Sequence, residues 1–82
     1  MWANIYSLEE FGEFIRMSRQ KKGLRQDEFA RKMHTTHVTL SKLENGTPIS
    51  SRYLMKALGY LNMQLVIVPR SAEIVVKELG DD

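Results

Sequence analysis

Hydrophobic residues in the first 61 positions recur at intervals of three and four, broken by turn residues. This spacing predicts four helices, over residues 8–22, 26–33, 37–44 and about 51–61. Ser7 and Glu10 are spaced as a capping box at the start of the first helix, and Gly23 can take the left-handed conformation that ends it. Thr36 is a good N-cap for the third helix, which Asn45 and Gly46 terminate.

The apolar positions of these helices form a candidate core, because they share one face within each helix. Its members are Leu8, Phe11, Phe14, Ile15, Phe29, Ala30, Met33, Leu40, Leu43, Leu54, Leu58 and Leu61. The pattern predicts an all-α domain over residues 1–62.

The pattern changes after residue 62. Residues 63–68 are apolar on both faces, rich in β-branched side chains and closed by Pro69, which is typical of a strand. Residues 73–79 form a second apolar segment, as helix or strand. An unpaired apolar strand promotes aggregation, so residues 63–68 must pair, either in a hairpin with residues 73–79 across the turn at 69–72 or with a second copy of the chain. We favour the second copy, with residues 63–82 serving dimerisation or partner binding.

Composition narrows the class of protein. A chain of 82 residues, 43% hydrophobic and 27% charged, fits one small globular domain. The absence of cysteine excludes disulfide scaffolds and thiolate chemistry. No apolar run approaches the ~20 residues that span a membrane, and the first residues do not resemble a signal peptide. We therefore expect a cytoplasmic protein that does not contact membranes.

Charge is distributed unevenly along the chain. Residues 1–60 contain ten lysines and arginines against six acidic residues, a net charge of +4, whereas residues 61–82 carry −2. A basic body with an acidic tail is compatible with a polyanionic partner, although a charge of this size decides little alone.

The second and third helices have the layout of a helix-turn-helix. Two short helices are joined by a three-residue turn, and the small residue Ala30 lies where they would cross. If Leu40 and Leu43 face inward, the outward side chains of the third helix are His37, Val38, Ser41 and Lys42. Lysine can donate to guanine O6 and N7, and valine can contact a thymine methyl group. The third helix is therefore the predicted recognition helix for a DNA major groove.

Residues 12–61 resemble the Cro/repressor (XRE-type) helix-turn-helix family. The resemblance rests on Arg19 with Gly23, on Leu24-x-Gln26-x-x-Phe29-Ala30, and on Leu43-Glu44-Asn45-Gly46. It implies a lambda-repressor-like fold of four to five helices. The fourth helix running into a strand is similar to the HipB-type antitoxins, in which such strands pair across a two-fold axis.

The resemblance also implies roles for individual residues. Gln26 would contact the DNA backbone and brace the recognition helix, and Arg19 and Glu44 match a structural ion pair. The complete predicted DNA-binding set is Gln26, Thr36, His37, Val38, Ser41, Lys42, Asn45 and Thr47, and the predicted dimer strand contains Met63, Leu65, Val66, Ile67 and Val68.

Three positions depart from the family pattern. Arg25 stands where Ser or Thr usually caps the second helix, which gives up a cap worth ~1 kcal/mol. His34 occupies a turn position commonly held by glycine, and histidine tolerates positive φ better than most residues. Val38 replaces a frequent polar residue, which favours methyl contacts or DNA shape over hydrogen-bonded readout.

The function implied by the resemblance is that of a homodimeric repressor bound to a double-stranded operator, acting as the antitoxin to a HipA-like kinase toxin. Two alternatives stay open, namely a phage-type or controller repressor without a toxin, and a protein-interaction module on a helix-turn-helix shell. No cofactor is expected. The sequence shows no constellation of acid, base and nucleophile, so we do not expect an enzyme, and His34 and His37 lack a third ligand for a metal.

Overall fold

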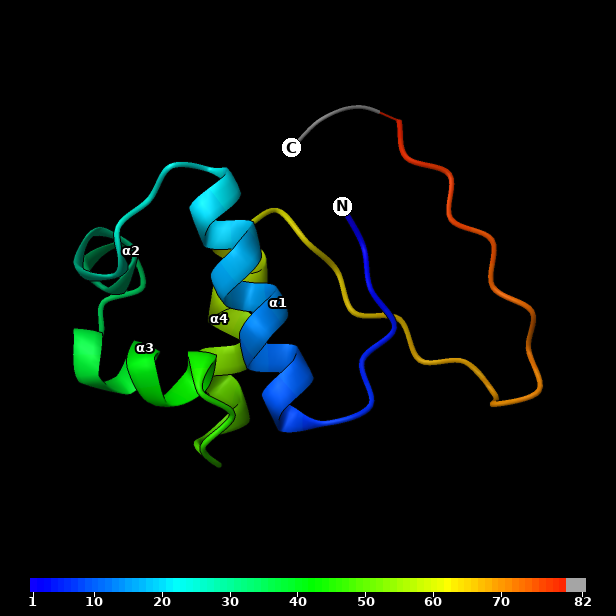
Figure 1. The fold of residues 1–82 in the computed structure, drawn as a ribbon, viewed down its shortest axis with the longest axis horizontal. Helices are drawn as coiled ribbons and strands as arrows, with labels where there is room; N and C mark the ends of the chain where they lie inside the picture. The colour runs from blue at the N-terminus through cyan, green and yellow to red at the C-terminus, as the bar shows by residue number, and fades with distance from the viewer. Residues whose placement is uncertain (80–82) are drawn as a thin grey trace.

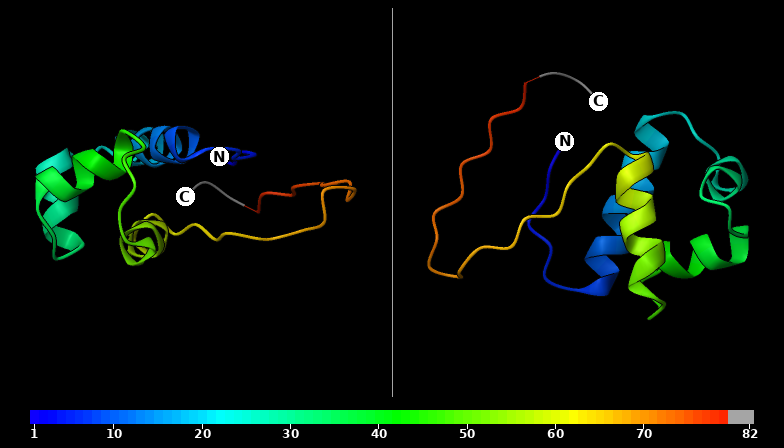
Figure 2. Two further views of the ribbon diagram at one scale, coloured as in Figure 1. Left: turned by 90° about the horizontal axis from the view of Figure 1, so that it is seen from below. Right: turned by 180° about the vertical axis from the view of Figure 1, so that it is seen from behind.

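The computed structural model describes residues 1–79 and has four helices in its described part. These are α1 (Leu8–Lys21), α2 (Gln26–Lys32), α3 (His37–Glu44) and α4 (Ser51–Tyr60). Helices α1 and α4 lie in two layers, with α2 and α3 packed at one end, and an extended segment leaves the opposite side of the body (Figures 1 and 2). The four predicted helices are confirmed, with bounds within one or two residues. No helix in this part of the chain is long and apolar enough to cross a membrane.

The helices begin and end where local chemistry favours it. The Ser7 hydroxyl accepts the Glu10 backbone N–H at 3.1 Å, which confirms the predicted cap of α1. Gly23 ends this helix at a φ of +71°, and His34 adopts a φ of +55° in the turn between α2 and α3. His34 thus adopts the left-handed conformation, which histidine tolerates better than most residues.

The start of α2 differs from that of α1 and α3. Arg25 provides no side-chain cap, as expected, but its backbone N–H donates to Glu28 Oε1 at 3.0 Å. This bond is one half of a capping box and satisfies the backbone N–H of Arg25. The other half, from the N-cap side chain to the N3 backbone N–H, is the one that a Ser or Thr would supply.

The core lies where α3 contacts α1, α2 and α4. Its fully or nearly buried hydrophobic residues are Ile15, Phe29, Ala30, Met33, Leu40, Leu43, Ala57, Leu58 and Leu61. The predicted core is confirmed for α2 and α3. In α1 the expected face, which also included Ser18, is confirmed at Ile15 and Ser18, but Leu8 stays 43% exposed and Gly12 and Arg19 are buried in addition.

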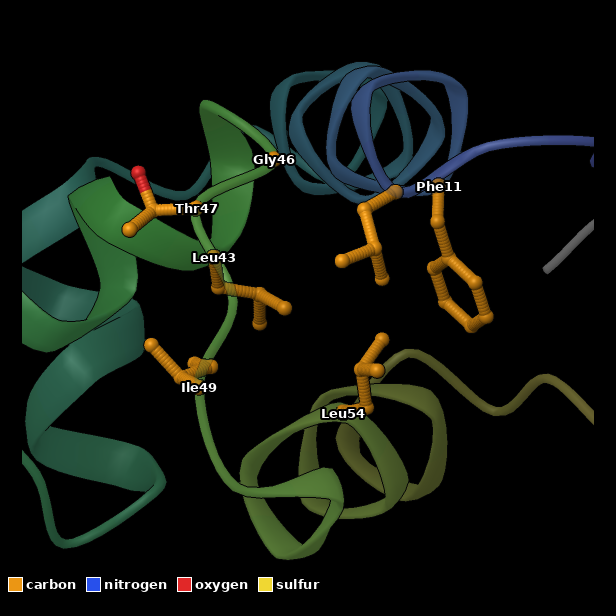
Figure 3. A pocket seen from close by; sticks show the side chains of 7 residues that line it. Phe11, Leu43, Gly46, Thr47, Ile49 and Leu54 are labelled. Atoms are coloured by element: carbon orange, nitrogen blue, oxygen red, sulfur yellow. The ribbon is translucent and has the colours of Figure 1, made fainter.

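The loop from α3 to α4 closes the body on one side. Leu8, Phe11, Leu43, Gly46, Thr47, Ile49 and Leu54 line a small pocket beneath it. Leu43 and Leu54 point toward one another across this pocket, while the side chain of Thr47 points away from it (Figure 3). Ile49 is partly buried against the core. The loop therefore packs through Ile49 and leaves Thr47 on the surface.

Residues 63–79, which we call the arm, have no regular secondary structure in this single chain. The arm consists of a first limb (63–68), a turn at 69–72 and a second limb (73–79), all extended along the open side of the body (Figure 1). The strand expected over 63–68 has the extended conformation but no ladder, and residues 73–79 form no helix. The in-chain hairpin is not formed, and pairing with a second copy stays a prediction.

Candidate nucleic-acid interface

Helix α3 is held at its C-terminal end by a buried ion pair. Arg19 of α1 donates through Nε to Glu44 Oε2 at 2.7 Å and through Nη2 to Glu44 Oε1 at 3.0 Å. The third guanidinium nitrogen, Nη1, donates to the Leu24 carbonyl at 2.8 Å. The predicted contact between Arg19 and Glu44 is present, and both side chains are at least nine-tenths buried. One arginine thus joins α1, the α1–α2 loop and the end of α3.

Gln26 takes part in the same network. Its amide nitrogen donates to Glu44 Oε1 at 3.2 Å, so Oε1 accepts from two side chains. Because Gln26 is the first residue of α2, this bond links the start of α2 to the end of α3. The bracing part of the role expected for Gln26 is present, and its contact with DNA stays a prediction.

Two glycines allow α1 to approach the end of α3. A Cβ on Gly12 would lie 2.3 Å from the carbonyl oxygen of Leu43, and one on Gly46 would lie 2.7 Å from the Cα of Glu9. Both neighbours are backbone atoms, which cannot move aside as a side-chain tip can. Gly46 also has a φ of +78°, which favours glycine. The local sequence gives no signal for a glycine at position 12, because the requirement comes from a tertiary contact.

The outer face of α3 presents the predicted readout residues together. His37, Val38 and Lys42 are exposed, Val38 at 53%, and Ser41 is half-buried between them. Leu40, Leu43 and Glu44 occupy the inner face. The structure therefore brings His37, Val38, Ser41 and Lys42 onto one accessible surface.

The residues at the two ends of α3 have structural partners of their own. The Thr36 hydroxyl accepts the Thr39 backbone N–H at 3.2 Å, so Thr36 is the N-cap. Asn45 lies at the C-terminal end and its amide nitrogen reaches Ser41 Oγ at 3.4 Å. Both remain exposed, as does Thr47 in the following loop, whereas Gln26, on α2, is half-buried like Ser41.

The basic residues at α2 and the lysine of α3 differ in their acidic partners. Arg25, at the N-cap of α2, and Arg31 form ion pairs with acidic residues of the same helix. Arg25 lies 3.4 Å from Asp27 and 3.1 Å from Glu28, and Arg31 lies 3.5 Å from the other Asp27 oxygen. Within residues 1–79 no acidic side chain pairs with Lys42. Lys42 of α3 thus has no acidic partner within residues 1–79, whereas Arg25 and Arg31 have theirs.

Arg52 and Lys56 are two further basic residues near this end of the body that the sequence analysis did not single out. Arg52 follows the α3–α4 loop and stacks on Tyr53, with its guanidinium carbon 5.2 Å from the ring centre. Lys56 donates to the carbonyl of Met33 at 3.3 Å, across the end of α2. Lys56 therefore secures the packing of α4 on α2, whereas Arg52 places a positive charge beside the loop.

The residues of the predicted dimer strand lie outside this surface, in the arm. Leu65, Val66, Ile67 and Val68 are all exposed, from 42% to 90%, and Met63 is half-buried against the core. At the far end of the arm the ammonium group of Met1 lies 2.6 Å from Glu78 Oε1. This contact lowers the pKa of the Glu78 carboxyl below its ordinary value of 4.5, mainly by hydrogen bonding to the charged form.

Comparison with solved structures finds the same fold in HipB. A HipA–HipB–O2–O3 complex contains a chain 24% identical, with a TM-score of 0.76, over 85% of this chain and all of that one. A HipB–O4 20mer complex is also 24% identical, with a TM-score of 0.77 over 85% of this chain and all of that one. A HipB–O1–O2 complex is 25% identical, with a TM-score of 0.75 over 83% of this chain and all of that one.

Comparison with curated proteins gave no match. A family model described as helix-turn-helix (HTH_3) matches residues 15–68, which is more than half of the chain and includes α2, the turn and α3. The match thus includes the pair of helices that the geometry identifies as a helix-turn-helix, together with α4. The chain belongs to the helix-turn-helix family HTH_3.

Proposed function

We propose that the protein is a sequence-specific DNA-binding repressor of the HipB type. The observation that carries the proposal is the exposed face of α3, where His37, Val38 and Lys42 stand on a helix fixed from behind by the bond between Arg19 and Glu44. A short helix held rigidly at its end and exposed along its outer face suits insertion into a major groove. The structural likeness to HipB chains in complexes named with O1, O2, O3 and O4 supports the same function.

In this proposal the contacts divide into two classes. Lys42, His37 and Val38 face base edges, while Gln26, Thr36, Asn45 and Thr47 contact the phosphate backbone and set the orientation. Thr36 and Asn45 sit at the two ends of α3, where hydroxyl and amide groups reach the strands that flank a groove. Ser41 lies between the two classes and can donate to either.

The functional unit of this proposal is a homodimer on a pseudo-palindromic operator. Pairing of the first limbs, through Leu65, Val66 and Ile67, would cover side chains that are at least half exposed in the single chain. A two-fold axis would set the two copies of α3 about one DNA turn apart, ~34 Å. Residues 1–62 would then bind DNA and residues 63–82 would assemble the dimer.

The biological role that fits this fold is that of an antitoxin. One of the similar HipB chains occurs in a complex with HipA, and we extend that partner, a HipA-type kinase toxin, to this protein. Purification from the native host, with mass spectrometry of what accompanies the protein, tests the extension. A kinase present in stoichiometric amount supports it, and its absence favours a repressor without a toxin.

The experiment that tests DNA binding is fluorescence anisotropy with DNA from the region upstream of the protein's own coding sequence, against a scrambled duplex of the same composition. We expect tight binding to the first alone, with a log–log salt slope of ~0.9 per neutralised phosphate. Equal affinity for both duplexes would contradict sequence-specific repression. Absence of binding to either would favour the protein-interaction module.

A further inference from the structure

The two limbs of the arm leave the same turn but do not pair with each other. Ala72 N–H donates to the Pro69 carbonyl at 2.9 Å, and no other backbone hydrogen bond within residues 1–79 joins the limbs. The limbs run apart from the turn onward in the front view (Figure 1), and in the view from below they lie at different heights (Figure 2). The arm therefore has the turn of a hairpin but none of its ladder.

The second limb is also held at its far end. Glu78 is bound by the ammonium group of Met1 at 2.6 Å, on the side of the body where the N-terminal segment leads into α1. A closed in-chain hairpin across the turn at 69–72 would place residue 77 opposite residue 64. In the single chain Glu78 contacts Met1, and residues 64 and 77 share no backbone hydrogen bond.

The side chains of the limbs suit different places in a sheet. The first limb has no charged residue and is apolar on both faces, as a strand with neighbours on both sides is. The second limb carries Glu73, Lys77 and Glu78 among its apolar residues, and such charges protect the edges of sheets. The composition of the first limb therefore suits a central strand, and that of the second limb suits an edge strand.

We propose that the space between the limbs is filled by the first limb of a second copy, so that two arms interlock in one four-stranded sheet. The proposal rests on the homodimer proposed above and adds the part played by residues 73–79. The first limbs of the two copies are the two central strands, and they run antiparallel across the two-fold axis. Each second limb is an outer strand, which lies beside the partner's first limb and runs parallel to it. Mixed sheets with such a parallel edge are common.

This arrangement accounts for the exposed apolar side chains of both limbs. Ile67 is 90% exposed and Val75 is 86% exposed in the single chain. Within residues 1–79 the limbs share no backbone hydrogen bond, although the Met63 N–H donates to the Leu58 carbonyl at 2.9 Å. Pairing of the first limbs alone would leave residues 73–79 without a ladder and one edge of each first limb free. The interlocked sheet gives each first limb two neighbours and leaves only the charged second limbs at the edges.

Disulfide trapping tests the proposal, because the chain has no cysteine of its own. A tagged Gln64→Cys chain is mixed and refolded with untagged chains that carry one cysteine at each position from 73 to 79, then oxidised. In the interlocked sheet residue 64 lies beside the start of the partner's second limb. We therefore expect the most cross-linked heterodimer with Ile74→Cys and the least with Leu79→Cys. Lys32→Cys, on the exposed face of α2, is the matched control and is expected to give none.

The in-chain hairpin makes the opposite prediction. A chain with both Gln64→Cys and Lys77→Cys would close an internal disulfide and stay monomeric on a non-reducing gel, with no heterodimer in the mixtures. That result, or the absence of any disulfide between the limbs, overturns the interlocked sheet. Sedimentation velocity of the unmodified protein separates the two proposals, since a dimer whose limbs fail to cross-link overturns the interlocked sheet alone, whereas a monomer overturns both.

Discussion

The helical body and the arm differ in where their hydrophobic side chains find partners. In the body, Phe29, Met33 and Leu40 are fully buried by other parts of the same chain. In the arm, Ile67 and Val75 are almost fully exposed, although their side chains are as apolar as those of the core. The body therefore buries its apolar surface within one chain, whereas the arm leaves its apolar surface exposed, as surfaces that meet another molecule do.

The largest expected effect is on the stability of the body, which depends on its buried ion pair. Glu44→Gln removes the charge that balances buried Arg19, and loss of one partner of a buried pair typically costs ~3–5 kcal/mol. We expect a drop of that size in the free energy of unfolding, measured by urea denaturation followed by circular dichroism. Glu13→Gln breaks the exposed pair with Arg16 and is the control, with an expected cost of ~0–1 kcal/mol. Equal effects of the two changes would refute the bracing role of Glu44.

A second change tests the close approach of α1 and α3. Gly12→Ala places a methyl group against the backbone of Leu43 and Glu44, and such overpacking costs ~1–3 kcal/mol. Gly59→Ala is the matched control, because a Cβ there meets nothing within 4 Å and alanine is favoured in a helix by ~0.5–1 kcal/mol. We therefore expect thermal unfolding temperatures to fall for Gly12→Ala and to rise for Gly59→Ala. A rise for both would show that α1 can shift without cost.

A third change keeps the body folded and removes its proposed readout. Lys42→Ala is expected to weaken binding to operator DNA by ~1–3 kcal/mol and to weaken random DNA much less. Lys21→Ala, which removes the same charge near Glu78 at the other end of the body, is the control and should change both affinities little. If Lys42→Ala weakens operator and random DNA equally, Lys42 contacts phosphate instead of bases.

A fourth change acts on the arm alone. Val66→Asp puts a charge into the uncharged first limb, where like charges of two copies would meet across the dimer. We expect the dimer dissociation constant to rise at least tenfold, which is ~1.4 kcal/mol, with the helical circular dichroism unchanged. Ser71→Asp places the same charge in the turn of the arm and should leave the dissociation constant unchanged. Loss of helical signal in Val66→Asp would show that the body and the arm are not separate.

The smallest effect concerns the ion pair at the end of the arm. Because the pKa of Glu78 is lowered in the folded chain, its contribution to stability is present above the pKa of the unfolded chain and is lost as the pH falls through the folded value. An NMR titration of the Glu78 carboxylate should have its midpoint below 4.5. Acetylation of the N-terminus removes the cation and should bring the midpoint upward, and an unchanged midpoint would exclude the contact with Met1.

The same contrast explains how much of the structure the sequence could predict. The helices follow from periodicity and caps, which are local, and the cap at Ser7 and the left-handed turns at Gly23 and His34 have clear local signals. The predicted pair of Arg19 and Glu44, 25 positions apart, came from the family resemblance rather than from spacing. The outward face of α3 followed once Leu40 and Leu43 were taken as buried.

Two features have no local signal. Gly12 lies inside a helix, where glycine is usually unfavourable, and its reason appears only when Leu43 and Glu44 are brought against it. The sequence of residues 73–79 fits a helix or a strand, and in the single chain these residues form neither. Periodicity within one chain therefore separates the body from the arm but does not predict the pairing of the arm.

The three-way contact of Arg19 has a consequence for the thermodynamics of DNA recognition. Hydrogen bonds already fix α3 to α1 and to the loop before α2 in the free protein. The conformational entropy cost of fixing that helix therefore falls on folding and not on DNA binding. Binding by the body is then close to rigid docking. Its heat-capacity change reflects the apolar surface buried against DNA, without the larger contribution that coupled folding would add.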